Sequence, residues 1–381
     1  MLHQRSLRRL GLVLCLATCS VAAHAGPPRT PLPSQPSDVP WPTLGWLRGD
    51  ARGADHIAIE TALGKLFAAK SETGVLDTRA LLVIQGGRLV VERYAPGFDA
   101  NSRFRSWSAG KSVTNAWVGI LVRDGRVSLD EPLDAKEWRA RPDDPRRAIT
   151  VRQALQMTTG LDNADGEAGP SGFGAQILFG NLAGDSAGAA ADKPLVHEPG
   201  TFWAYSTGTT QLLARLVTER AGEDARSFIA RELAAPLGLH SLLVETDRVG
   251  TPFGGAFVWA TGPDWARLGL LYLRDGVWEG RRILPRGWVD FSRTPAPVPN
   301  NGTYGAQFWV NGKPGTGQHP MYGPELETFE MNGNNGQIVA MVPARDLVIV
   351  RLGEQHASSW EALRAQLADL IEAFPMRGAA R

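Results

Sequence analysis

Length, composition and charge already restrict what this chain can be. It has 381 residues, of which 43% are apolar and 21% are charged, and 40 Lys and Arg balance 39 Asp and Glu to a formal net charge of +1. This ordinary globular composition excludes a disordered or fibrous protein. The balanced charge gives no electrostatic reason to expect a nucleic-acid partner, and the length allows one large domain or two medium ones.

The first 25 residues have the pattern of a secretory signal peptide. Three arginines among the first nine residues precede the apolar run 10–23, and Ala23-His24-Ala25 forms a small-x-small cleavage site. The apolar run is too short to span a bilayer. We therefore expect cleavage after Ala25 and a periplasmic or secreted protein without membrane insertion. Both cysteines lie in this leader, so the mature chain is expected to have no disulfide and no cysteine nucleophile.

A proline-rich linker, residues 26–43, follows the leader. Seven prolines between Gly26 and Pro42 exclude a helix or a central strand and predict an extended tether. Beyond it, the spacing of apolar residues predicts regular elements. The expected strands cover 81–84, 89–91, 306–310, 337–342 and 347–352, and the expected helices cover 57–69, 108–122, 151–157, 210–221, 225–237, 265–275 and 358–374.

The order of these elements indicates how the domains are built. Strands near both ends of the chain with helices between them suggest an α/β (α+β) domain formed by residues 44–135 together with 285–381. A mostly helical domain, residues 136–284, is expected to be inserted between these two parts. No segment after the leader reaches transmembrane length.

Ser108 and Lys111 form a Ser-x-x-Lys motif at the start of an expected helix. Residues three apart share one helix face, so the lysine amine can reach the serine hydroxyl and take its proton. The N-terminal N–H groups and the helix dipole would favour a developing oxyanion. By itself, so short a motif is better explained by an N-capping serine beside a surface lysine.

A second candidate nucleophile is Ser186, in the Gly-x-Ser-x-Gly sequence from Gly184 to Gly188. This is the letter pattern of the nucleophile elbow of α/β-hydrolases, which needs a strand before the serine and a long helix after it. Here the segment 179–183 is short for a buried strand and Pro194 soon ends the following helix, so a small-residue loop is favoured. The partner histidine of this alternative would be His240, His319 or His356.

The surroundings of Ser108 decide between the two serines. Residues 104–129 read FRSWSAGKSVTNAWVGILVRDGRVSL, and four more segments follow in the order of one family: 149–161 (ITVRQALQMTTGL), 198–206 (EPGTFWAYS), 261–269 (TGPDWARLG) and 333–337 (GNNGQ). In these segments the chain resembles the serine β-lactamase/penicillin-binding superfamily, and within it the branch of class C β-lactamase-like esterases and 6-aminohexanoate-oligomer hydrolases.

The resemblance implies a β-lactamase-like fold, in which helices flank an antiparallel sheet and a mostly helical domain is inserted. It also implies that Ser108 is the nucleophile of an acyl-enzyme, with Lys111 and Tyr205 acting together as the base. The backbone N–H groups of Ser108 and Asn334 would form the oxyanion hole. No cofactor and no metal are implied.

The sequence departs from the β-lactamase pattern in ways that bear on the substrate. The family's Tyr-x-Asn is replaced by Tyr205-Ser206-Thr207, and the Lys/His-Thr-Gly strand that grips a β-lactam carboxylate is missing. Lys313-Pro314-Gly315 imitates it, but its proline removes a strand donor and indicates a turn. We therefore expect a small ester or amide as substrate rather than a β-lactam.

The remaining candidates concern the substrate cleft. Trp107, Trp203, Thr207 and Asn335 are expected to contact the substrate, and Asp162 and Asp185 are weaker candidates for a polar contact. The histidines show no metal-ligand spacing. Three hypotheses remain: a serine hydrolase using Ser108, an α/β-hydrolase-type esterase using Ser186, and a catalytically inactive penicillin-binding-like protein that only binds its ligand.

Overall fold

The computed structural model describes residues 29–68, 76–166, 169–300, 302–311, 322, 327–355 and 360–378. The expected signal peptide, the Lys313-Pro314-Gly315 turn, His319 and His356 lie outside the described residues. Their interpretation therefore stays a prediction.

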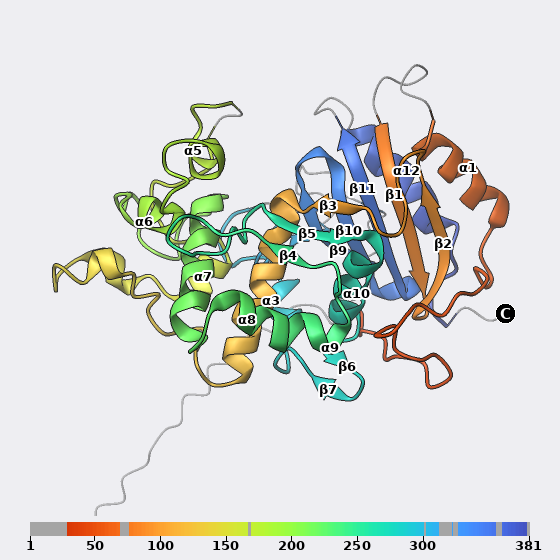
Figure 1. The fold of residues 1–381 in the computed structure, drawn as a ribbon, viewed down its shortest axis with the longest axis horizontal. Coiled ribbons are helices and arrows are strands. Elements are labelled where there is room, and N and C mark those ends of the chain that lie inside the picture. The colour runs from red at the N-terminus through yellow and green to blue at the C-terminus, as the bar shows by residue number, and fades with distance from the viewer. Residues whose placement is uncertain are drawn as a thin grey trace, which may run out of the picture.

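The centre of the fold is a six-stranded sheet in the order β2-β1-β11-β10-β9-β8, in which every neighbouring pair is antiparallel (Figure 1). The central strands are apolar on both faces, as expected of strands that are covered on both sides. The antiparallel sheet confirms the predicted fold class and excludes the α/β-hydrolase alternative, which needs a mainly parallel sheet. The strands are β1 (Leu76–Gln85), β2 (Arg88–Tyr94), β8 (Trp309–Val310), β9 (Phe329–Gly333), β10 (Gln337–Val342) and β11 (Leu347–Gln355).

Helices cover both faces of this sheet. The helices α1 (His56–Leu66) and α12 (Trp360–Glu372), from the two ends of the chain, pack on one face. The helix α10 (Gly262–Leu273) packs on the other face, so closely that a Cβ on Gly269 would lie 2.5 Å from Val348. This helix falls in the range expected for the inserted domain, yet it forms part of the sheet's cover.

The other helices lie beside the sheet (Figure 1), and among them α3 (Gly110–Arg123) is buried along most of its length. The helix α7 (Thr207–Arg220) packs against α3. The rest are α4 (Val151–Leu155), α5 (Phe173–Phe179), α6 (Ser186–Ala191), α8 (Ala225–Ile229), α9 (Ala235–Leu237) and α11 (Trp288–Ser292). Within the described part of the chain, no helix is long and apolar enough to cross a membrane.

Two small antiparallel sheets complete the fold. One has the order β3-β5-β4, formed by Arg103–Arg105, Val258–Thr261 and Leu243–Val244, and the other pairs β6 (Val277–Trp278) with β7 (Arg281–Arg282). The first of these matters for the site, because β3 leads directly into the residues before Ser108.

The proline-rich segment is fastened to the surface of the protein. Arg267 Nε donates to the carbonyl of Pro42 at 2.8 Å, Arg274 Nε donates to Gln35 Oε1 at 2.9 Å, and the rings of Trp41 and Trp278 lie 4.9 Å apart. Residues 29–43 of the predicted linker therefore include contacts with the body of the molecule. Proline keeps this segment extended, but arginines of α10 and its C-terminal end hold it against the body of the molecule.

Candidate active site

Ser108 lies in a tight 3-10 turn, Trp107–Ala109, between β3 and α3. Trp107 has φ +45°, a conformation that is costly for a bulky side chain and that marks stored strain. Ser106 holds the turn in place: its N–H donates to the carbonyl of Val258 at 2.7 Å and its hydroxyl donates to that of Ala256 at 2.8 Å. The turn thus presents the half-exposed Ser108 at the start of a buried helix.

Lys111 lies one turn further along α3 and is 1% exposed. Its Nζ donates to Ser108 Oγ at 3.1 Å, Thr207 Oγ1 at 3.0 Å and the carbonyl of Gly255 at 3.3 Å. These three oxygen atoms surround the amino group of Lys111. Among the described residues, no carboxylate pairs directly with Lys111, so its amine is placed to exchange a proton with Ser108.

Thr207 connects Lys111 to a carboxylate that the sequence analysis did not single out. Its hydroxyl donates to Asp165 Oδ2 at 2.7 Å, and its backbone N–H donates to Asp165 Oδ1 at 2.5 Å. The chain of contacts is therefore Ser108, Lys111, Thr207 and Asp165. Thr207 is 3% exposed with its hydroxyl fully engaged, which does not fit the predicted contact with substrate. No sequence signal distinguished Asp165 from its neighbours.

The two aspartates considered instead have other surroundings. Asp162 is exposed, and Asp185 is the N-cap of α6, where its Oδ1 accepts from the N–H of Gly188 at 2.8 Å.

Tyr205 lies beside Lys111, whose Nζ is 4.7 Å from the centroid of the tyrosine ring. Rings of Tyr304 and Trp309 surround Tyr205 at centroid distances of 5.7 and 5.5 Å. Among the described contacts, the Tyr205 hydroxyl makes no hydrogen bond to Ser108 or Lys111. The structure therefore brings the three predicted catalytic residues together, with the ring of Tyr205 rather than its hydroxyl against the lysine. Its role as a base stays a prediction.

Tyr304 is a neighbouring phenol that the family pattern does not include. Burial raises its pKa well above 10, and the nearby Tyr205 and Asp165 raise it further. Tyr304 therefore stays neutral, and its part in the site is to pack against Tyr205. The ring of the predicted substrate residue Trp203 packs near both phenols, 5.6 Å from the ring of Tyr304 and 6.4 Å from that of Tyr205.

The end of β9 lies directly against the Ser108 turn. A Cβ on Gly333 would lie 2.1 Å from the carbonyl oxygen of Ser106 and 3.1 Å from the backbone nitrogen of Ala109, so only glycine fits there. The exposed Asn334, the predicted second oxyanion-hole residue, follows this contact. The structure thus brings its backbone next to the turn that carries Ser108.

Asn335 lies in the tight turn between β9 and β10, directly after Asn334. It has φ +59°, its side-chain amide donates to Glu354, and its carbonyl accepts from Arg351 NH1 at 3.1 Å. Arg351 is fully buried, and burial lowers the pKa of its guanidinium to about 10. The amide of Asn335, predicted to contact substrate, is therefore used to hold this turn.

The strand β9 carries no cation where β-lactamases grip a carboxylate. It reads Phe329-Glu330-Met331-Asn332-Gly333, and Glu330 is fully buried. Its carboxylate accepts from Arg364 at 2.5 and 2.6 Å and from Tyr322 Oη at 2.8 Å. This acidic residue is thus neutralised inside the protein, on the side of α12.

Ser186 has the surroundings of a structural residue. It is fully buried, and its N–H and hydroxyl donate to Asp247 Oδ2 at 3.1 and 2.8 Å. Its hydroxyl accepts from Gln211 Nε2 at 2.8 Å. His240, the one proposed partner histidine that lies in the described part of the chain, is exposed and makes no hydrogen bond to it. The hypothesis that Ser186 is a nucleophile is wrong, because no substrate can reach it.

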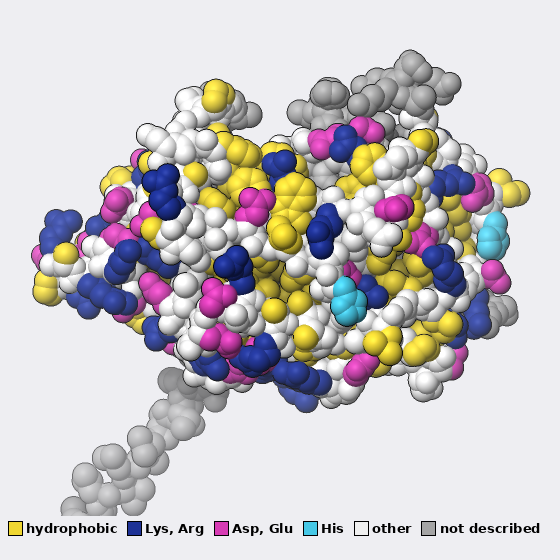
Figure 2. Space-filling model, in the orientation of Figure 1, with side chains coloured by type: hydrophobic (Ala, Val, Ile, Leu, Met, Phe, Trp, Pro, Cys, Tyr) yellow, Lys and Arg dark blue, Asp and Glu magenta, His cyan; other side chains and the backbone are white. Residues whose placement is uncertain are grey.

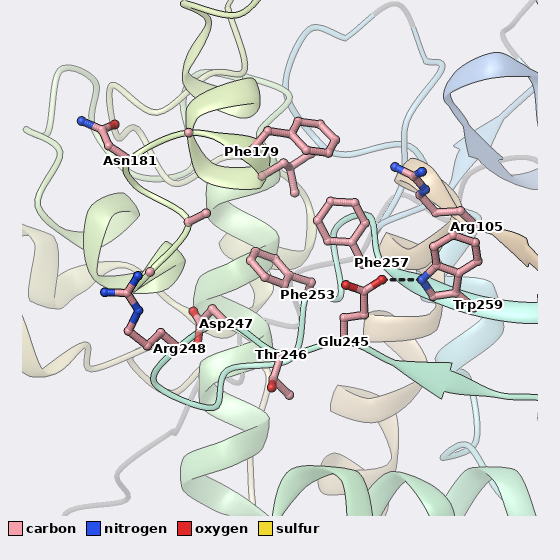
Figure 3. Close-up of a pocket in the computed structure, with 14 residues that line it drawn as sticks. Arg105, Phe179, Asn181, Glu245, Thr246, Asp247, Arg248, Phe253, Phe257 and Trp259 are labelled. Atoms are coloured by element: carbon pink, nitrogen blue, oxygen red, sulfur yellow. Dashed lines mark hydrogen bonds between the residues drawn. The ribbon is translucent and has the colours of Figure 1, made fainter.

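A cavity of about 650 Å³ opens next to Trp107, whose ring lies 6.0 Å from that of Phe179 (Figure 3). It lies between α5 and the strands β4 and β5, and its lining includes Arg105, Phe179, Glu245, Phe253, Phe257 and Trp259. Figure 2 shows apolar side chains gathered on this face between α5 and β5, with charged side chains beside them. Among the described residues, no group of three or more His, Cys, Asp and Glu side chains could hold a metal ion.

Comparison with known proteins gives consistent results. The family model described as Beta-lactamase matches residues 63–372. The chain is 26% identical to 6-aminohexanoate-dimer hydrolase from Paenarthrobacter ureafaciens, over 80% of this chain and 77% of that protein. Two solved structures share the fold: a penicillin-binding protein homologue from Caulobacter crescentus (TM-score 0.64, 18% identity, 86% of this chain and 98% of that one) and the hydrolase EstCE1 (TM-score 0.60, 18% identity, 82% and 98%).

Proposed function

The chain belongs to the Beta-lactamase family, a family that includes serine hydrolases, and on that premise we propose that it hydrolyses a small ester or amide through an acyl-enzyme on Ser108. The observation that carries this proposal is the hydrogen bond from Lys111 Nζ to Ser108 Oγ, at 3.1 Å. The Lys111 side chain is buried, while Ser108 is half-exposed. We also propose that the protein is exported, on the strength of its leader sequence.

The proposed reaction has two steps. In the first, Ser108 Oγ attacks the carbonyl carbon and Lys111, acting as a neutral amine, takes the hydroxyl proton. The oxyanion is held by the N–H groups of Ser108 and Asn334, and the tetrahedral intermediate expels the alcohol or amine, which leaves with the proton returned by Lys111 and Tyr205. In the second step, water attacks the ester carbonyl and gives one proton to Lys111. The C–Oγ bond then breaks, the acid is released, and Lys111 returns the proton to Ser108 Oγ.

The residue set favours an ordinary ester or amide over a β-lactam. The relative 6-aminohexanoate-dimer hydrolase is named for an amide substrate, and EstCE1 is described as a hydrolase with promiscuous acyltransferase activity. The strand β9 offers Glu330 and Asn332 where a cation would be needed, and Glu330 is already paired with Arg364. A β-lactam carboxylate would therefore find no partner on this strand.

The test is hydrolysis of p-nitrophenyl butyrate by the mature protein and by the variants Ser108→Ala and Ser186→Ala, with mass spectrometry of a fluorophosphonate adduct. We expect Ser108→Ala to lose at least about a thousandfold in kcat/KM and the adduct to map to Ser108. Ser186→Ala, the matched control, should keep its activity per folded molecule.

Two outcomes would contradict the proposal. Loss of activity only in Ser186→Ala would move the nucleophile to a residue that this structure buries. Absence of both hydrolysis and labelling, across a panel of esters and amides, would favour the catalytically inactive, ligand-binding alternative.

A further inference from the structure

The cavity beside Trp107 has an aromatic floor that continues from the Ser108 turn. The ring of Trp107 meets Phe179, Phe179 meets Phe257 at 5.5 Å, and Phe257 meets Phe253 at 5.2 Å. Phe253 and Phe257 are each 7% exposed, while Phe179 is 61% exposed and lies at the rim. A ligand in this cavity would lie over apolar rings and would reach the residue that precedes the nucleophile.

Arg105 stands at one end of the cavity, beside Trp259 (Figure 3). Its guanidinium lies 4.5 Å from the ring of Trp107 and 5.2 Å from that of Trp259, its cross-strand partner on β5. Among the described residues, Arg105 has no ion pair and no hydrogen bond, and its Nε is buried without an acceptor. Stacking on aromatic rings fixes the group, while the N–H donors along its edge stay unused.

The two acidic side chains of the cavity differ in how far they are engaged. Asp247 accepts from Ser186 and also from the backbone N–H groups of Val249 and Thr251, at 3.1 and 2.8 Å. Glu245 is exposed, and its Oε1 accepts from Trp259 Nε1 at 2.6 Å, as Figure 3 shows. Its other oxygen has no hydrogen bond among the described residues, so Glu245 is the acidic side chain of the cavity that could compete for a cationic ligand.

Arg248, at the opposite end of the cavity, is a second guanidinium without a hydrogen bond or ion pair among the described residues. It is exposed, and no aromatic ring among the described residues stacks on it. Arg105 is the better anchor of the two, because its orientation is fixed before a ligand arrives and because it lies three residues from Ser108.

We propose that this cavity binds a carboxylate carried on an apolar chain, with Arg105 gripping the carboxylate through paired N–H donors and the phenylalanine rings covering the chain. If the proposed hydrolase function holds, on which this step rests, the substrates are esters or amides whose acyl or leaving part carries such a carboxylate. Arg105, on β3, would then bind the substrate carboxylate, which no residue of β9 is placed to bind. A bidentate guanidinium–carboxylate contact is a strong and directional one.

A binding experiment tests the proposal without catalysis. Calorimetry would compare 4-phenylbutyrate with the neutral 4-phenyl-1-butanol and the cationic 4-phenylbutylamine. We expect the carboxylate to bind at least about tenfold more tightly than the alcohol, which is the usual strength of a charge-assisted hydrogen bond. Arg105→Met should abolish this preference, and Arg105→Lys, which keeps the charge but not the fork, should retain part of it.

Two further variants serve as controls. Arg103→Gln removes an exposed arginine of the same strand, which donates to the carbonyl of Ser241 at 2.9 Å, and should change nothing. Arg248→Gln should reduce the preference less than Arg105→Met does. Equal binding of carboxylate and alcohol, tighter binding of the amine through Glu245, no binding of 4-phenylbutyrate at millimolar concentration, or a larger loss in Arg248→Gln would each overturn the proposal.

A kinetic comparison separates this proposal from the proposed function. The substrates are p-nitrophenyl hexanoate and the mono-p-nitrophenyl ester of adipic acid, which carries a terminal carboxylate. A lower KM for the adipate ester that is lost in Arg105→Met supports both proposals. Ser108-dependent hydrolysis of both esters with equal KM, together with no carboxylate binding, removes only the Arg105 proposal. Arg105-dependent binding of 4-phenylbutyrate without any hydrolysis removes only the hydrolase function.

Discussion

The turn that carries Ser108 and the helix start that carries Ser186 make opposite use of a serine. Ser108 is half-exposed, follows a residue with φ +45°, and receives a hydrogen bond from a buried lysine. Ser186 is fully buried behind an aspartate N-cap, and its hydroxyl both donates to Asp247 and accepts from Gln211. The first region leaves the hydroxyl oxygen open to a reacting carbon, and the second gives the hydroxyl both an acceptor and a donor inside the protein.

The difference teaches that saturation of hydrogen bonds distinguishes a structural serine from a reactive one. A buried hydroxyl with two good partners stabilises the fold and has nothing left to offer a substrate. A serine on a strained turn costs free energy, so the surrounding packing must hold the turn in place. Here Gly333 and Ser106 supply that packing around Ser108.

The largest expected effect comes from removing the base. Lys111→Met should lower kcat for p-nitrophenyl butyrate by at least about a thousandfold, equivalent to about 4 kcal/mol, because Ser108 loses its only close proton acceptor among the described residues. Methionine fills much of the same buried volume, so circular dichroism and the Tm should show a folded protein. Lys193→Met, which removes a lysine lying 4.3 Å from the ring of Phe173, is the matched control and should keep full activity. Substantial activity in Lys111→Met would show that Lys111 is not the base that distinguishes Ser108 from Ser186.

The next largest effect is a loss of stability when the hydrogen bonds around Ser186 are removed. Asp247→Leu leaves the N–H groups of Ser186, Val249 and Thr251 without their acceptor, and we expect a loss of about 3 kcal/mol in the free energy of unfolding. Urea unfolding measures it. Asp185→Ala, which removes only the N-cap of α6, should cost about 1 kcal/mol. If Asp247→Leu instead unfolds like the unmodified protein but abolishes hydrolysis, the structural interpretation of the Ser186 region is wrong.

The two regions also show what the sequence could and could not predict. Apolar periodicity located α3, α7, α10 and the strands β1, β10 and β11, because their patterns extend over several residues. It missed β3, β4 and β5, which are two to four residues long, although β3 and β5 position Arg105 and hold the Ser108 turn.

The site divides in the same way. The family motifs predicted Ser108, Lys111 and Tyr205 as a catalytic set, and the structure places these three residues next to one another. The motifs could not locate Asp165, since its importance comes from a contact across 42 residues of chain with Thr207. Likewise Thr207 and Asn335 lie near the site as expected, but only the structure shows that their polar groups are used internally.

The third prediction tests that internal chain of contacts. Thr207→Val keeps the volume of the side chain but removes the hydroxyl between Lys111 and Asp165. We expect kcat to fall by about tenfold to a hundredfold with KM little changed, since the hydroxyl orients the base and does not contact substrate. Thr207→Ser should restore most of the rate. A change confined to KM would return Thr207 to the substrate-binding role that the sequence suggested.

The smallest effect concerns pH and the far end of the helix that begins at Ser186. Arg146 donates to Asp144 at 2.7 Å and also to the carbonyl of Ala191 at the end of α6, and its hydrogen bonds lower the pKa of Asp144 from 3.8 to about 2. Because the folded protein favours the ionised carboxylate, this contact stabilises the fold above pH 3.8 and loses its effect as the pH falls towards about 2.

Asp144→Asn should therefore lower the free energy of unfolding by about 1 kcal/mol near neutral pH and progressively less below about pH 4, as measured by urea unfolding. Asp130→Asn, which removes an exposed carboxylate paired with Arg152, should cost less at every pH. Hydrolysis by Asp144→Asn near neutral pH should be unchanged, and a loss there would mean that the Ser186 region serves the reaction and not only the fold.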